Sequence, residues 1–263
     1  MSEAPMPLAA PSRHALWGEA RVALDFLQML PALRDPGRDV ALAAVASPIM
    51  VLPGFGASDA AMWPLRRFLT LKGLQVEGWA LGVNRAGLDR PHTLADISPG
   101  WGSPQKVPYR REAGVAHLCD LVARRVSTKA QALGRPMTLI GWSLGGSIAR
   151  EVARDLPDTV DQIITLGSPV IGGPKYTAGA SVLKSKGLDL DWIEAQVKKR
   201  DARPIQQPIT SIISRSDGIV SWSAAVDRIS PRVRHIEVKV SHLGMGFSPT
   251  VWQHIVDTLA VRP

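Results

Sequence analysis

The sequence is poor in cysteine, and this scarcity limits the chemistry that the chain can support. Cys119 is the one cysteine among 263 residues, so no disulfide can form within the chain. It lies in a helix-like stretch, residues 117–122, where no activating pattern of residues surrounds it. We therefore expect a buried, inert thiol and not a nucleophile.

Long hydrophobic runs are also missing. The best apolar run, residues 22–30, is interrupted by Asp25 and Gln28, and residues 1–4 contain no basic residue that would begin a secretory signal. These features predict neither a transmembrane span nor a signal peptide. We expect a cytoplasmic protein.

Aromatic residues make up 5% of the chain and are not interleaved with its basic residues. The formal net charge is +8, but the basic residues form small separated groups, at 66–67, 110–111, 124–125 and 198–200. A nucleic-acid surface would need aromatic stacking platforms within such groups. The charge therefore favours anionic substrates or a peripheral membrane contact over nucleic acid.

What the chain does contain is an alternation of apolar strands and amphipathic helices. Strands are predicted at 49–52, 76–81, 137–140, 162–166, 209–213 and 235–240, and helices from about 64 to 73, 112 to 133, 144 to 154 and 250 to 259. The inner strands read as almost continuous apolar runs, which is typical of strands buried on both faces. The pattern predicts an α/β fold with a mostly parallel sheet and helices on both sides.

The domain organisation follows from the same pattern. Residues 1–40 are expected to be an N-terminal tail and a helix over 15–33, whose apolar face consists of Leu16, Ala20, Ala23, Leu27 and Leu30. Residues 41–263 form the α/β domain. Two connections, about 88–111 and 172–205, are longer than a simple turn between strand and helix needs, and they are expected to pack together as a small cap.

Residues 141–145, Gly-Trp-Ser-Leu-Gly, fit the G-x-S-x-G pattern of a nucleophile elbow. A predicted strand enters this pattern and a predicted helix leaves it. Such a turn places Ser143 above the sheet, and its two flanking glycines avoid collisions with neighbouring backbone. We expect Ser143 to be a nucleophile, the alternative being a glycine-rich turn that happens to hold a serine.

A serine nucleophile needs a base and an acid that orients the base. His242 follows the last predicted strand, at the sheet edge where ligands bind in such folds. Asp217 follows the strand before it, whereas Asp158 and Asp161 precede a strand and should lie at the opposite edge. We predict His242 as general base and Asp217 as the orienting acid. The alternatives are that His242 is a surface histidine and that Asp217 only stabilises a turn.

An oxyanion hole should complete the site. Two backbone N–H groups must point at the charge that develops on the substrate oxygen. We expect these donors to be Leu144, which follows the nucleophile, and Phe55, in the loop Pro53-Gly54-Phe55-Gly56 after the first strand. A plain glycine-rich turn is the alternative for this loop.

These residues resemble the lipase- and esterase-like α/β-hydrolases of bacteria over about residues 47–260. The resemblance rests on six segments in order: 51–56, 78–84, 141–146, 166–169, 217–220 and 241–244. It implies the α/β-hydrolase fold and the hydrolysis of carboxylic esters without metal or cofactor. Pro53-Gly54 stands where many relatives have His-Gly, and residues 88–111 exceed what relatives need, so substrate preference does not follow from the resemblance.

Three apolar residues near the expected site, Trp142, Trp222 and Met245, are candidates for contacting an apolar acyl or aromatic ester. Core packing is the alternative for two or three of the apolar residues around the site. The same triad would serve an acyltransferase or thioesterase. A non-enzymatic ligand-binding protein on this scaffold, and a peripheral membrane protein that uses helix 15–33 and the basic surface, are further alternatives.

Overall fold

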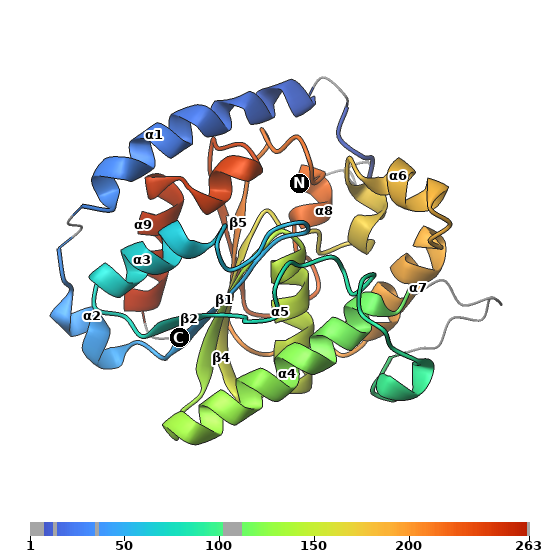
Figure 1. The fold of residues 1–263 in the computed structure, drawn as a ribbon, viewed down its shortest axis with the longest axis horizontal. Coiled ribbons are helices and arrows are strands. Elements are labelled where there is room, and N and C mark those ends of the chain that lie inside the picture. The colour runs from blue at the N-terminus through green and yellow to red at the C-terminus, as the bar shows by residue number, and fades with distance from the viewer. Residues whose placement is uncertain (1–7, 13–14, 35–36, 102–111, 262–263) are drawn as a thin grey trace.

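The fold is described from a computed structural model that covers residues 8–12, 15–34, 37–101 and 112–261. Its centre is a sheet of six parallel strands in the order β2-β1-β3-β4-β5-β6 (Figure 1). The strands are β1 (Ile49–Leu52), β2 (Val76–Gly78), β3 (Met137–Trp142), β4 (Val160–Leu166), β5 (Ile209–Ile213) and β6 (Val233–Glu237). This confirms the predicted parallel α/β architecture.

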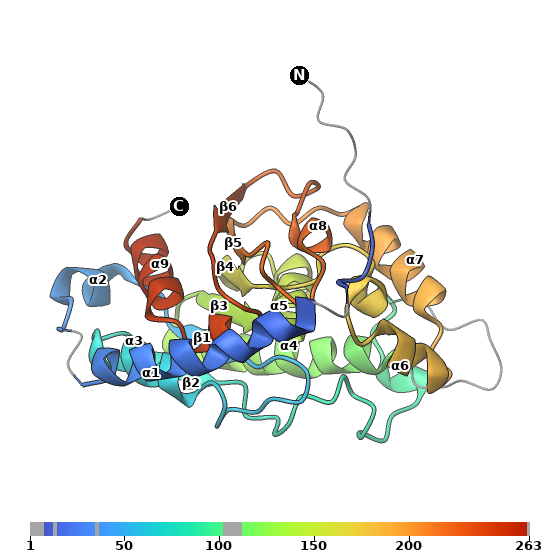
Figure 2. The same ribbon diagram turned by 90° about the horizontal axis from the view of Figure 1, so that it is seen from above.

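Helices cover both faces of the sheet (Figures 1 and 2). The α-helices are α1 (Val22–Ala32), α2 (Val40–Val45), α3 (Trp63–Leu71), α4 (Gly114–Leu133), α5 (Leu144–Asp155), α6 (Ala180–Ser185), α7 (Leu190–Asp201), α8 (Trp222–Ala225) and α9 (Pro249–Ala260). Short 3-10 helices are η1 (Ala15–Arg21), η2 (Leu94–Asp96), η3 (Gly173–Tyr176) and η4 (Leu243–Gly246). Among the described residues, no helix combines the length and apolarity that crossing a membrane requires.

The alternation of side chains along β1 separates the two cores. Ile49 and Val51 face a core shared with α2, α3 and α9, whereas Met50 and Leu52 face a core shared with α4 and α5. Successive side chains in a strand point to opposite faces, so a strand buried on both sides must be apolar throughout. All four residues of β1 are fully buried.

The predicted bounds of β2 and β6 are wrong by two to three residues. β2 stops at Gly78 instead of residue 81, because the backbone N–H groups of Trp79 and Ala80 donate to the Asp59 carboxylate, at 3.0 and 2.9 Å, and not to a neighbouring strand. β6 lies at the sheet edge and runs from Val233 to Glu237, two to three residues earlier than predicted.

The apolar face expected in the N-terminal helix lies on its exposed side. Leu16, Leu27 and Leu30 are exposed, whereas Glu19 and Met29 are buried. Met29 belongs to the core that α9 also forms, so α1 packs on the α/β domain. The side of this segment that docks is held partly by the polar contacts of Glu19, which apolar periodicity does not report.

The described parts of the two long connections contact each other, but not beside Ser143. The guanidinium of Arg200 stacks 4.1 Å from the centre of the Trp101 ring, and Arg200 also pairs with Asp155 at the end of α5. That end lies about 16 Å along the helix from its start, at the rise of an α-helix. This contact lies at the end of α5 away from Ser143, whereas Tyr176 and Ala178 of the second connection bond to Ser221 and Ile219 in the loop after Asp217. Residues 102–111 of the first connection lie outside the described residues.

Candidate active site

Ser143 sits in a sharp turn between β3 and α5. Its backbone has φ 53° and ψ −122°, a conformation that non-glycine residues rarely adopt. The glycines on either side are sterically required: a Cβ on Gly141 would lie 2.4 Å from the carbonyl carbon of Gly145, and a Cβ on Gly145 would lie 2.3 Å from the Leu52 oxygen. This packing presses the helix start against the sheet and leaves Ser143 half-buried at the strand end.

Asp217 and His242 form a buried pair in two loops at the same sheet edge. His242 Nδ1 lies 2.7 Å from Asp217 Oδ2, and both side chains are about 3% exposed. The other carboxylate oxygen, Oδ1, accepts the backbone N–H groups of Ile219 and Val220, at 2.9 and 2.7 Å. With both oxygens engaged, the carboxylate cannot turn away from the imidazole, and the ring is held in one orientation.

The elbow is linked to this pair through its neighbours. Trp142 Nε1 donates to the His242 carbonyl at 3.1 Å, and the Ser143 N–H donates to the Leu166 carbonyl at 2.8 Å. A Cβ on the next residue, Gly167, would lie 3.1 Å from His242 Nδ1. No hydrogen bond joins Ser143 Oγ to the His242 ring, and catalytic pairs of this kind often close only in the substrate complex.

The two predicted oxyanion donors lie beside Ser143. Leu144 is the first residue of α5, and its N–H has no acceptor among the described residues, as expected for a helix start. The N–H of Phe55 also has no such acceptor, whereas the next N–H, of Gly56, donates to Asn84. A Cβ on Gly54 would lie 3.2 Å from Ser143 Cβ, so this loop approaches the serine closely.

Asn84 braces that loop and was not predicted. It is fully buried, and its side-chain amide donates to the Pro53 carbonyl at 2.8 Å. Its backbone N–H donates to Ala57, and its carbonyl accepts the Gly56 N–H. Three bonds from one residue thus set the path of the loop. The segment 78–84 was noted only as part of the family resemblance, and its partners are about 30 residues away in the sequence.

Glu19 is the second residue that sequence reasoning missed. Its buried carboxylate accepts three backbone N–H groups: Gly218 and His242 on Oε1, at 2.8 and 3.0 Å, and Leu243 on Oε2, at 2.8 Å. One side chain from the N-terminal segment therefore ties the Asp217 loop to the His242 loop. No spacing rule could indicate this, because its partners lie about 200 residues later.

The three predicted substrate contacts have different surroundings. Met245 is fully buried in the core, and Trp142 is 7% exposed, with its indole N–H bonded to His242. Trp222 is half-buried under the Arg215 guanidinium, 3.9 Å from the ring centre. Met245 and Trp142 therefore pack behind the loops of Asp217 and His242, which fits the core alternative that the sequence left open.

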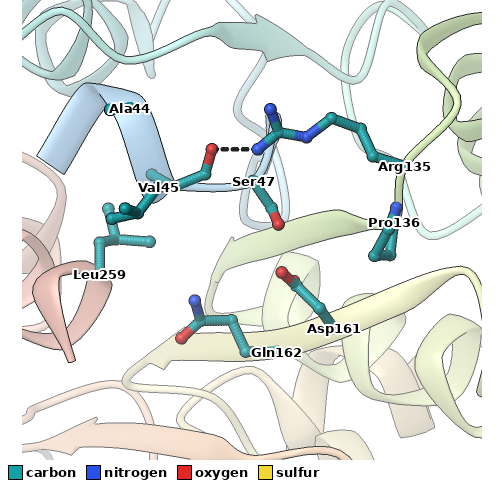
Figure 3. Close-up of a pocket in the computed structure, with 9 residues that line it drawn as sticks. Ala44, Val45, Ser47, Arg135, Pro136, Asp161, Gln162 and Leu259 are labelled. Atoms are coloured by element: carbon teal, nitrogen blue, oxygen red, sulfur yellow. Dashed lines mark hydrogen bonds between the residues drawn. The ribbon is translucent and has the colours of Figure 1, made fainter. Parts of the chain in front are cut away.

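The other aspartates considered as the acid lie elsewhere. Asp161, the second residue of β4, accepts a hydrogen bond from Thr138 at 2.9 Å. It lines a hollow of about 400 Å³ at the amino ends of β3 and β4, together with Arg135, Gln162 and Leu259 (Figure 3). This is the edge of the sheet opposite Ser143, so Asp161 cannot reach His242.

Within the described parts of the chain, no three His, Cys, Asp or Glu side chains are grouped as metal ligands. Cys119 is buried in α4, and burial raises the pKa of its thiol well above the ordinary value. A thiol in this environment is not a nucleophile at neutral pH.

Curated relatives of the chain are esterases, although each match covers only part of them. A pimeloyl-acyl-carrier-protein methyl ester esterase of Sodalis glossinidius is 29% identical over 163 residues, which is 61% of this chain and 53% of that protein. Its counterpart from Aliivibrio salmonicida is 36% identical over 110 residues, 42% of this chain and 36% of that protein. The chain thus spans about half or less of the relatives it matches. No protein-family model matches it.

Solved structures resemble the chain over most of its length. A Bacillus licheniformis lipase superposes with a TM-score of 0.56 and 13% identity, covering 86% of this chain and 96% of that one. The carboxylesterase CesB of Bacillus subtilis gives a TM-score of 0.53 and 16% identity, covering 92% and 98%. The predicted α/β-hydrolase fold is confirmed, and so is the resemblance to esterases and lipases.

Proposed function

We propose that this α/β-hydrolase-fold protein hydrolyses carboxylic esters through an acyl-enzyme formed on Ser143. The observation that supports this most directly is the buried contact of 2.7 Å between Asp217 and His242, beside a serine whose backbone is held at φ 53°. In acyl transfer by a serine, the strained turn exposes the nucleophilic hydroxyl and the oriented histidine accepts its proton.

In the proposed reaction, Ser143 Oγ attacks the ester carbonyl carbon while His242 Nε2 takes the hydroxyl proton. Asp217 stabilises the resulting imidazolium through its contact with Nδ1. The N–H groups of Leu144 and Phe55 stabilise the oxyanion. The tetrahedral intermediate collapses as the ester C–O bond breaks, and His242 gives its proton to the departing alcohol.

The second half of the reaction uses the same groups. A water molecule gives a proton to His242 and attacks the acyl carbon. The bond to Ser143 Oγ then breaks, the proton returns to Oγ, and the free acid leaves. Glu19 and Asn84 contact neither reacting bond. Their contacts hold the base loop and the oxyanion loop, so we infer a positioning role for each.

The substrate class is inferred from the proteins that the chain resembles. The matched relatives are esterases of a methyl ester on an acyl chain, and the structural relatives are a lipase and a carboxylesterase. We propose an ester with an apolar acyl chain and a small alcohol. A panel of methyl and p-nitrophenyl esters, from acetyl to decanoyl and including a monomethyl dicarboxylate, would rank these chemistries by kcat/KM.

The decisive experiment compares Ser143→Ala with Ser147→Ala on p-nitrophenyl butyrate. Ser147 is a half-buried serine of the same helix whose hydroxyl donates to the Pro169 carbonyl, so it is a matched control. We expect Ser143→Ala alone to abolish turnover, and a fluorophosphonate to label Ser143. Labelling at another serine, or turnover in Ser143→Ala, would refute the proposal. Product analysis with competing alcohols and thiols would separate hydrolysis from acyl transfer.

A further inference from the structure

An apolar strip faces outward along the N-terminal helices. Large hydrophobic side chains in this segment are between 44% and 81% exposed, Trp17 most of all. The strip, called the outer face of α1 below, consists of Leu16, Trp17, Leu24, Phe26, Leu27 and Leu30. In both views α1 lies on the outside of the molecule, with no other element over its outer side (Figures 1 and 2).

This exposure is not caused by a loose helix. The inner side of the segment is docked on the domain by Met29 in the core and by the three hydrogen bonds of Glu19. A Cβ on Gly244 would meet the Asp25 carboxylate at 2.1 Å, so α1 also sits tightly against η4. The helix therefore presents its apolar side to the outside while its acidic side chains point inward.

The charges on this segment select the kind of surface that can cover it. Neither acidic residue within 15–34 is fully exposed to solvent: Glu19 is buried and Asp25 is half-buried. The exposed charged residues of the same stretch are Arg21 and Arg34, which are both basic. An apolar strip flanked by cations fits a bilayer with anionic headgroups, because leucine and tryptophan enter the interface while arginine meets the phosphates.

We propose that the outer face of α1 docks the protein on an anionic lipid surface, with α1 lying in the plane of the interface. The chain carries a formal net charge of +8, which adds long-range attraction to such a surface. In a dimer formed through this face, the cations Arg21 and Arg34 of one copy would approach those of the other, which opposes self-association. Lipid therefore suits the face better than self-association. The proposal does not depend on the chemistry of Ser143.

The test is flotation of the full chain with vesicles of phosphatidylglycerol and, separately, of phosphatidylcholine. The variant is Leu24→Glu with Leu27→Glu. The matched control is Leu133→Glu with Val261→Glu, two exposed apolar residues outside the strip, at the last residue of α4 and the C-cap of α9. Far-ultraviolet circular dichroism would establish that both variants are folded.

We expect the wild type and the control to float with phosphatidylglycerol, less so at high salt, and to bind phosphatidylcholine weakly. The α1 variant should lose at least about tenfold in partitioning, because two leucines that would enter the bilayer are replaced by charges. Absence of flotation by the wild type, or equal flotation by the α1 variant, would overturn the proposal. So would a dimer in light scattering that the α1 variant alone makes monomeric.

Discussion

Glu19 Oε1 accepts the backbone N–H of His242 at 3.0 Å, across 223 positions of sequence. The same oxygen accepts the N–H of Gly218, the residue after Asp217. A single buried carboxylate thus fixes the distance between the loop of the acid and the loop of the base. Backbone N–H groups that are buried need such partners, and here an N-terminal segment supplies them.

Removing this carboxylate should lower kcat more than it changes KM. Glu19→Ala leaves three N–H groups without an acceptor, and small displacements of a catalytic loop can cost about 100-fold in rate. Glu19→Gln keeps one oxygen acceptor and should recover part of the loss. The measurement is kcat and KM on a p-nitrophenyl ester.

The control for Glu19 is Met29→Ala, which opens a cavity under the adjoining helix α1 but removes no hydrogen bond to either loop. Melting temperatures of both variants would be measured with the kinetics. If Met29→Ala matched Glu19→Ala in melting temperature and also in kcat, Glu19 would have only a structural role.

Asp217→Asn should fold and lose about 10³- to 10⁴-fold in kcat, as in other triads. The amide oxygen can still accept from Ile219 and Val220, so the loop keeps its shape. The amide nitrogen would then face His242 Nδ1 and favour the wrong tautomer. The measurement is steady-state kinetics of Asp217→Asn, with Asp161→Asn, at the opposite edge of the sheet, as the control variant. Loss of activity in Asp161→Asn alone would mean that the acid is misassigned.

Gly145→Ala should impair both stability and turnover. The new methyl group would lie 2.3 Å from the Leu52 carbonyl oxygen, at the point where β1 leads into the Pro53–Phe55 loop. Either the elbow or that loop must shift. Thermal unfolding and kcat are compared with Gly179→Ala, where φ is −82° and the nearest atom is 3.7 Å away. Equal behaviour of the two variants would contradict the steric account of the elbow.

The buried pair of Asp227 and Arg150 should make stability fall in acid. Burial raises the pKa of Asp227, but the Arg150 guanidinium at 2.7 Å and the N–H groups of Ile229 and Ser230 outweigh it and lower the pKa to about 2. A carboxyl group whose pKa is lowered on folding stabilises the folded state at pH values above its pKa in the unfolded chain. That contribution, about 2 kcal/mol, is lost as pH falls from about 4 to 2.

Urea unfolding at several values of pH in that window tests the pair. Asp227→Asn should be less stable near neutral pH, because it leaves Arg150 buried without its counter-charge, and its stability should change less across the window. The control is Glu237→Gln, which removes an exposed pair with Arg215. An acid transition unchanged in Asp227→Asn would show that other carboxyls cause it.

Local patterns in the sequence determined the β-α alternation, the parallel sheet, the elbow and the order Ser143, Asp217, His242. These depend on short-range rules: side-chain alternation in strands, the steric need for glycine around a strained turn, and the fact that parallel strands end at one edge. The strand and helix bounds near Ser143 follow from the same few residues, and they lie within two residues of prediction.

Only the tertiary structure decided which side of α1 is buried, what holds the catalytic loops, and where Trp101 packs. Each depends on partners far away in the chain: Glu19 on residues 218, 242 and 243, Asn84 on residue 53, and Trp101 on Arg200. The apolar periodicity of residues 15–33 is real, but it marks the exposed side. Hydrophobicity records that a face avoids water, and it does not say whether protein or another apolar phase covers it.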